Sequence, residues 1–192
     1  KHRSNLKSVS DETLIALLSS KRRNEALTEL YQRYGSRVFG YFLRMFRGDR
    51  DKAQDFVQEL FLRILEKHHQ FDPNKTFSTW MFTIASNMCK TAFRKEPVKL
   101  PIQGNEKVYL SDDDHSKKAF NTALMEALGD LEEVHRSAFI LRYINHLSLK
   151  EISEISDIPL GTVKSRLFNA TKKMAEALKE FQPNENNLFK LQ

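Results

Sequence analysis

The chain has 192 residues, a length that suits one or two small domains. Its formal net charge is +6 and its isoelectric point is about 9.4, which favours an acidic partner such as nucleic acid. Cys89 is the single cysteine and no run approaches ~18 apolar residues, which argues against a disulfide-stapled scaffold and against membrane insertion. The composition therefore predicts a protein of the reducing cytoplasm.

Caps and apolar spacing predict three helices in the first part of the chain. Ser10, followed by two acids, is a good helix start, and a second helix is expected over 24–47 with Gly48 placed to end it. Asp49 can cap a third helix that reaches about residue 68. The chain contains no convincing strand pattern and no internal repeat, so the sequence predicts an all-α fold.

The third predicted helix carries a group of residues that point away from its apolar stripe. They recur at i, i+3, i+4 and i+7 and are Asp55, Gln58, Glu59 and Leu62. Two acids and an amide are usual on a solvated face, but Leu62 in their midst indicates a protein contact. The pattern alone favours a solvated surface over a docking site, because single exposed apolar residues are common.

The next segment combines aromatic, amide and basic residues. Residues 68–77 form a predicted loop that contains Phe71 and Phe77, and Ser78 is expected to cap the helix that follows, with Trp80 at the edge of its outer face. That outer face is expected to carry Thr83, Ser86, Asn87, Lys90 and Arg94. Such a set suits single-stranded nucleic acid, whose bases need a flat apolar partner and whose phosphates need cations. Pattern alone favours the alternative, in which the aromatic residues are core.

The composition changes over residues 97–117, which contain two prolines, a glycine and an acidic run. These features are typical of a flexible linker. We therefore expect one helical domain over residues 10–96, a second over 118–181, and a polar tail over 182–192.

The second domain contains a predicted helix-turn-helix, Leu147–Met174. Ser148 and Glu151 can form a capping box at its first helix, and Asp157 and Pro159 end that helix. The second helix has an apolar stripe, and its other side presents Ser165, Asn169 and Lys172, flanked by Thr162, Lys164 and Phe168, with Arg166 projecting from the side. Two short helices with a polar, basic outer face are typical of DNA binding, although an ordinary helical hairpin stays open as the alternative.

No motif for catalysis, a cofactor or a metal is evident in the sequence. The glycines are isolated, and the adjacent His68 and His69 lack the i, i+4 spacing of helical metal ligands. Cys89 has neither a second thiol nor a neighbouring base. The sequence therefore predicts a protein that is not an enzyme and needs no cofactor.

Three segments in this order resemble the extracytoplasmic-function (ECF) class of bacterial sigma factors, and the resemblance spans roughly residues 10–181. Ala53–Leu65 is similar to the family's core-polymerase-binding helix. Phe71–Lys95 is similar to the loop and helix that melt and read the minus-ten promoter element, and Ile140–Leu167 resembles the reader of the minus-thirty-five element. Each segment is moderately specific, and the three in order are highly specific.

The resemblance implies a function. It predicts a sigma factor that binds core RNA polymerase, recognises both promoter elements in DNA and nucleates melting without catalysis. The linker would thread the polymerase channel. Free members of the class are commonly held inactive by an anti-sigma factor, which would be a further partner.

The resemblance also assigns residues to three surfaces. The polymerase surface, expected to dock on the clamp coiled coil of the largest subunit, consists of Asp55, Gln58, Glu59 and Leu62. The minus-ten surface, expected to capture a flipped base and hold the melted strand, consists of His69, Phe71, Asn74, Lys75, Thr76, Phe77, Trp80, Asn87, Lys90 and Arg94. The minus-thirty-five surface consists of Thr162, Lys164, Ser165, Arg166, Asn169 and Lys172.

Some positions depart from the family pattern. Asn169 and Thr171 stand where arginines are common, which implies fewer phosphate contacts or another base preference. Asp157 replaces the usual glycine of the turn, and aspartate tolerates left-handed backbone angles. Thr83 and Ser86 replace residues that are often basic, which argues against strong gripping of a duplex there.

Two other functions compete with this prediction. A stand-alone DNA-binding regulator would use only the helix-turn-helix, and the polymerase surface beside an aromatic and amide-bearing helix argues against it. A helical enzyme or adaptor is the other alternative, and no cluster of acids, bases or metal ligands in the sequence supports it.

Overall fold

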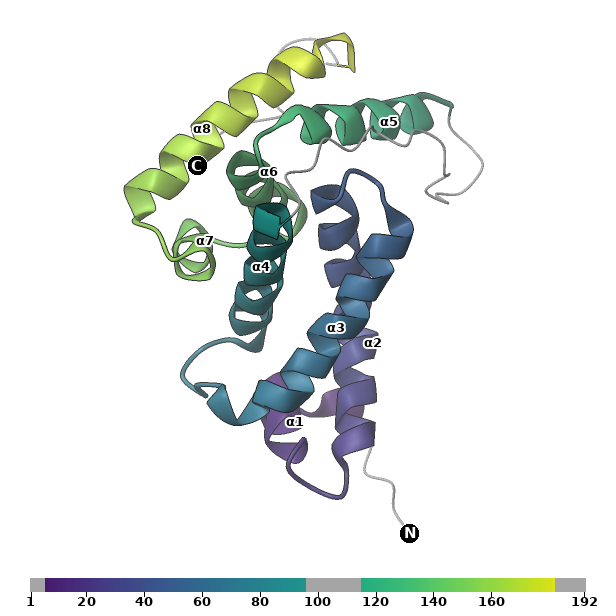
Figure 1. Ribbon diagram of the computed structural model, residues 1–192, viewed down its shortest axis with the longest axis vertical. Coiled ribbons are helices and arrows are strands. Elements are labelled where there is room, and N and C mark those ends of the chain that lie inside the picture. The colour runs from purple at the N-terminus through teal and green to yellow at the C-terminus, as the bar shows by residue number, and fades with distance from the viewer. Residues whose placement is uncertain (1–5, 96–114, 182–192) are drawn as a thin grey trace.

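The computed structural model describes residues 6–95 and 115–181, and every regular element in these two ranges is helical (Figure 1). The predicted all-α fold is confirmed for this part of the chain. The predicted tail and residues 97–114 of the predicted linker lie outside the described residues.

The first domain is built on a long helical hairpin. Its elements are a 3₁₀ turn at Leu6–Ser8, α1 (Asp11–Leu17), α2 (Arg23–Met45), α3 (Arg50–Lys67), a 3₁₀ turn at His68–Gln70, and α4 (Phe77–Lys95). Helices α2 and α3 run side by side in opposite directions, and α4 packs against both (Figure 1). Gly48 has a φ of 90° and donates its N–H to Leu43 O at 2.8 Å, so it ends α2 in a left-handed conformation that glycine adopts without strain.

The cap of α4 differs from the prediction. The helix begins at Phe77, and the Thr76 hydroxyl accepts a hydrogen bond from Thr79 N at 3.4 Å. Thr76 is therefore the capping residue, and the prediction that Ser78 caps this helix was wrong. Both residues are good caps, and the sequence alone gives no strong reason to prefer the earlier one.

The second domain contains the predicted helix-turn-helix. Its elements are α5 (His115–Asp130), α6 (Glu133–Phe139), a π-helical turn at Ile140–Ile144, α7 (Leu149–Ser156), α8 (Leu160–Ala177) and a 3₁₀ turn at Lys179–Phe181. Ser148 and Glu151 form the predicted capping box at the start of α7. Asp157 ends α7 with a φ of 56°, the left-handed angle expected from its position in the turn.

The two domains pack directly against each other, which the sequence did not predict. Helix α4 lies against α7, and the end of α2 lies against α5 and α6. Arg37 Nη2 donates to Asn145 O at 2.9 Å, and Tyr41 OH lies 3.1 Å from Ser137 Oγ. We call this packing the closed arrangement.

Candidate functional site

All four residues of the polymerase surface are exposed on the outer side of α3. Leu62 is 56% exposed, which is high for a large apolar side chain in this fold. Glu59 Oε1 accepts a hydrogen bond from Arg63 Nε at 2.8 Å, and both side chains of this ion pair are open to solvent. The surface therefore presents an exposed apolar side chain beside accessible acids, which suits a basic partner with an apolar recess.

The loop before α4 presents its polar side chains on a defined turn. Asp72 Oδ1 accepts hydrogen bonds from both the backbone N and the side-chain Nδ2 of Asn74, each at 3.0 Å. Lys75 N donates to Asp72 O at 2.9 Å, which closes the turn. His69, Asn74, Lys75 and Thr76 are exposed. The side chains that could meet a single-stranded base are thus held on an ordered backbone.

The aromatic residues of the minus-ten surface divide into core and surface. Phe77 is 1% exposed and packs edge-on against Tyr34, with ring centroids 5.0 Å apart. The core alternative therefore holds for Phe77, which is buried and contacts Phe71 of the loop. Phe71 and Trp80 are half-buried and contact each other at 5.4 Å between centroids, so part of each side chain stays accessible.

The outer face of α4 is partly covered by the second domain. Asn87, Lys90 and Arg94 are exposed as expected, but Ser86 is only 3% exposed. The prediction that Ser86 lies on the open face was wrong, because Ser86 is in line with the buried Phe82, Cys89 and Phe93 along α4 and lies beside Tyr41 of α2. Thr79 is likewise 4% exposed.

Polar contacts join α4 to α7 in the closed arrangement. Lys90 Nζ donates to Ser156 O at 3.1 Å, and Thr79 Oγ1 donates to Glu151 Oε1 at 3.4 Å. Burial lowers the pKa of Lys90, and the neighbouring charge of Arg166 lowers it further. Burial alone would raise the pKa of Glu151, but hydrogen bonds from Ser148 and Thr79 outweigh it and lower that pKa.

Helix α8 carries the minus-thirty-five surface on its outer side. Lys164, Ser165, Asn169 and Lys172 are exposed, whereas Thr162 and Arg166 are half-buried. Phe168, which was not among the predicted site residues, is 62% exposed. A phenylalanine on an otherwise polar helix face was the signal in the sequence that could have indicated it.

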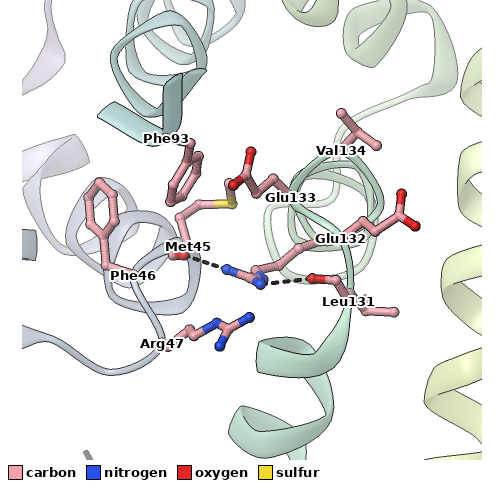
Figure 2. A pocket seen from close by; sticks show the side chains of 9 residues that line it. Met45, Phe46, Arg47, Phe93, Leu131, Glu132, Glu133 and Val134 are labelled. Carbon is pink, nitrogen blue, oxygen red and sulfur yellow. Dashed lines mark hydrogen bonds between the residues drawn. The ribbon is translucent and has the colours of Figure 1, made fainter. Parts of the chain in front are cut away.

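Two cavities lie where the domains meet. The smaller, of about 50 Å³, is lined by Lys90 and Arg166 together with Cys89, and it therefore joins cations from two different predicted DNA surfaces. The larger, of about 370 Å³, is lined by Met45, Phe93, Leu131 and their neighbours (Figure 2). Among the described residues, no polar atom that lines the larger cavity is buried without a partner, so its walls specify no ligand.

Arg136 forms one wall of the larger cavity and is 2% exposed. Its guanidinium donates to three carbonyl oxygens of its own domain, those of Leu128, Gly129 and Leu131, at 2.7 to 2.9 Å. It also donates, at 2.7 Å, to the carbonyl oxygen of Met45, the last residue of α2. Burial, followed by the charge of Arg47, lowers the pKa of Arg136 to about 10, so the side chain stays charged at neutral pH.

The described part of the chain shows two further properties. Residues 6–95 and 115–181 contain no group of three or more His, Cys, Asp or Glu side chains that could hold a metal ion. None of the helices in these ranges has both the length and the apolar character that crossing a bilayer requires.

Comparison with known proteins matches both halves of the chain to one family. Residues 30–97 match the model described as Sigma-70 region 2, and residues 121–174 match Sigma-70, region 4. The ECF RNA polymerase sigma factor SigW of Bacillus subtilis is 28% identical over 174 residues, which cover 83% of this chain and 92% of SigW. The ECF RNA polymerase sigma-E factor of Haemophilus influenzae is 30% identical over 160 residues, 76% of this chain and 84% of that protein.

Solved structures agree in fold. CnrH in complex with the cytosolic domain of CnrY has a TM-score of 0.67 at 21% identity, covering 90% of this chain and 99% of CnrH. The sigma factor RpoE of Bartonella quintana, in complex with the anti-sigma factor NepR, has a TM-score of 0.66 at 24% identity. The match covers 79% of this chain and 96% of RpoE. With region 2 and region 4 matched in order and relatives similar over most of their length, the chain belongs to the ECF RNA polymerase sigma factors and is a promoter-recognising transcription-initiation factor.

Proposed function

We propose that the three surfaces divide the work of initiation between them. The polymerase surface binds core polymerase, the minus-ten surface captures and holds the melted strand, and the minus-thirty-five surface reads duplex DNA. The observation that carries this assignment is that most residues of each surface are solvent-accessible and that each surface has its own helix, α3, α4 or α8. The chain contributes binding rather than catalysis, and it acts where bacterial polymerase does, in the cytoplasm.

Base capture is assigned to the loop before α4. Extracting a base from the stack costs a few kcal/mol. A pocket that is already ordered adds no further cost of ordering when it receives the base. The Asp72 turn supplies that order, and the accessible faces of Phe71 and Trp80 can stack on bases at the edge of the melted strand. Asn87, Lys90 and Arg94 extend the surface along α4 for amide and phosphate contacts.

Duplex reading is assigned to the exposed side of α8. Ser165 and Asn169 are the candidates for base edges in the major groove, and Phe168 can pack on a thymine methyl group. Lys164, Arg166 and Lys172 supply positive charge for phosphates, which positions the helix without specifying sequence.

The closed arrangement is incompatible with simultaneous use of both DNA surfaces. Lys90 and Arg166 line one small cavity. The two promoter elements are about 25 base pairs apart by their names, which is roughly 85 Å of duplex at ~3.4 Å per base pair. The domains therefore separate when the chain engages a promoter. The hydrogen bond from Lys90 Nζ to Ser156 O is then lost, and Lys90 is free to contact DNA.

An anti-sigma factor is a further proposed partner. Two of the solved structures with this fold are complexes: the sigma factor RpoE is bound to the anti-sigma factor NepR, and CnrH is bound to the cytosolic domain of CnrY. By analogy, a protein that binds this chain in its closed arrangement would keep the domains together and withhold both DNA surfaces.

Replacing Trp80 with alanine tests the minus-ten assignment. In a reconstituted reaction with core polymerase, the wild-type chain directs transcripts from discrete promoter starts, mapped by sequencing their 5′ ends. Trp80→Ala is expected to reduce promoter opening, measured by permanganate reactivity of unpaired thymines, by roughly ten-fold or more, because one base-stacking platform is worth ~1–3 kcal/mol. Closed-complex binding should change little.

The half-buried environment of Trp80 requires a control for folding. Trp80→Phe keeps an aromatic face against Phe71 and should retain most of the opening activity. If Trp80→Ala weakens closed binding and opening equally, Trp80 is a core residue and the stacking assignment fails.

A further inference from the structure

Helix α2 exposes an aromatic ring close to the polymerase surface. Tyr31 is 52% exposed, and with Leu62 it is one of two large apolar side chains of the α2–α3 hairpin that stand open to solvent among the described residues. Neither the sequence pattern nor the resemblance assigned Tyr31 a role. An exposed aromatic residue on a rigid element is the type of side chain that dominates protein interfaces.

The ring of Tyr31 contacts two neighbours. It packs on Phe61 of α3, with centroids 5.0 Å apart and planes inclined at 58°. It also lies over Gly35, one turn further along α2, where an added Cβ would stand 3.4 to 3.6 Å from three ring atoms. The Tyr31 ring thus covers the backbone at Gly35, and Gly35 is buried. Because the ring already has these contacts, Tyr31 would lose little conformational freedom on binding a partner.

The helical geometry of α3 places Tyr31 beside the polymerase surface and not on the opposite side of the hairpin. At 100° per residue, Phe61 stands about 60° from Gln58 and about 100° from Leu62 around the helix axis. Phe56, at the other edge of the buried stripe, is turned about 140° away from Phe61. A ring that packs on Phe61 and remains half-exposed therefore lies nearest Gln58 of the polymerase surface, with Leu62 about 40° further around the helix.

We propose that Tyr31 extends the polymerase surface across the hairpin and is its aromatic anchor. This inference rests on the proposed role of that surface and adds a second helix to it. Core polymerase would meet an apolar ridge in which Tyr31 and the edge of Phe61 lie on one side of Gln58 and Leu62 lies on the other, with the carboxylates of Asp55 and Glu59 beyond Leu62.

The charges around the ridge select this occupant over others. Asp55 and Glu59 are exposed acids, so they repel nucleic acid phosphates. A second copy of the chain would bring the same acids against themselves, which is unfavourable in a two-fold interface. A basic protein surface with an apolar recess satisfies both the acids and the ridge.

Substitution of Tyr31 in the full-length chain tests the inference. Tyr31→Ala should weaken equilibrium binding to core polymerase, measured without DNA, by roughly 10- to 100-fold, as for a buried aromatic anchor. Tyr31→Phe retains the ring and should bind within about twofold of the wild type. Thermal unfolding of each variant is recorded in parallel, because the ring also packs on Phe61.

If Tyr31→Ala destabilises the hairpin, two further variants of opposite charge at this position still test the inference. The stems of Tyr31→Lys and Tyr31→Glu can both cover Phe61. Against a basic partner, Tyr31→Lys should bind core polymerase several-fold more weakly than Tyr31→Glu. Equal binding of the two, or weaker binding of Tyr31→Glu, would overturn the inference.

Leu62→Ala separates failure of this inference from failure of the proposed function. If Leu62→Ala weakens core binding while a stably folded Tyr31→Ala binds normally, the polymerase surface stands and Tyr31 is not part of it. If neither substitution weakens binding, the polymerase surface itself is wrongly assigned. A change in self-association of Tyr31→Ala by sedimentation, with core binding intact, would assign the ridge to a second copy of the chain instead.

Discussion

Replacing Asp55 and Glu59 together with arginine is expected to abolish binding to core polymerase. Both carboxylates are exposed on the outer side of α3, one turn apart, and they share this side with Leu62. Against a basic partner each reversal replaces attraction with repulsion, and like charges brought together at an interface cost several kcal/mol. The loss should exceed roughly 100-fold in affinity, measured by fluorescence anisotropy of the labelled full-length chain.

The control for this variant carries the same change in net charge elsewhere. Glu126 on α5 and Glu176 on α8 are also exposed acids, and their double replacement by arginine should leave core affinity nearly unchanged. The Glu59–Arg63 pair is open to solvent, so its loss should change the free energy of unfolding by at most ~1 kcal/mol. Core affinity retained by the Asp55→Arg, Glu59→Arg variant would remove this face from the polymerase interface.

Replacing Arg136 with alanine is expected to cause the largest loss of stability of any single substitution considered. The guanidinium satisfies carbonyl oxygens at the ends of two helices, α5 in its own domain and α2 in the other. Alanine would leave these buried acceptors without donors and open a cavity, so the free energy of unfolding should fall by about 3–5 kcal/mol. Urea unfolding of the full-length chain, followed by circular dichroism, measures this change.

The control for Arg136 is another arginine on a helix surface. Arg63→Ala removes the exposed pair with Glu59 and should change the unfolding free energy by about 0.5 kcal/mol or less. Because three of the four acceptors of Arg136 belong to its own domain, the side chain stays bonded when the domains separate. A loss below ~1 kcal/mol for Arg136→Ala would mean that water or other donors satisfy these carbonyls.

The helix-turn-helix was predictable because its signals are local. Ser148 and Glu151 stand three residues apart, as a capping box requires, and Pro159 fixes where α8 can begin. Asp157 adopts the left-handed angle that its place in the turn demands. Each feature depends on residues within one or two turns of helix, so the sequence contains all the information needed.

The closed arrangement was not predictable for the opposite reason. The contacts of Thr79 with Glu151 and of Arg37 with the backbone carbonyl of Asn145 join residues far apart in the chain. Thr79, Glu151 and Arg37 look like ordinary surface residues of their helices, and a backbone carbonyl carries no sequence signal. Periodicity identifies which side of a helix is polar, but it does not show when another domain covers that side.

The aromatic residues show a similar limit of pattern reasoning. Phe77 and Trp80 both lie in the first turn of α4, where apolar periodicity has barely begun, and yet one is core and the other half-exposed. For the polymerase surface, exposure follows from either alternative, a solvated face or a docking site. The resemblance, and not the pattern, pointed to docking.

The central claim is that the closed arrangement opens when this sigma factor engages polymerase and promoter. Nitroxide labels at Thr28 on α2 and Glu176 on α8, both exposed, in a Cys89→Ala background, report the distance between the domains by pulsed electron paramagnetic resonance. The free chain should give one narrow distance distribution, and addition of core polymerase with promoter DNA should shift it to distances longer by tens of ångströms, in keeping with elements roughly 85 Å apart on the duplex. An unchanged distance in a complex that still initiates transcription would contradict the account.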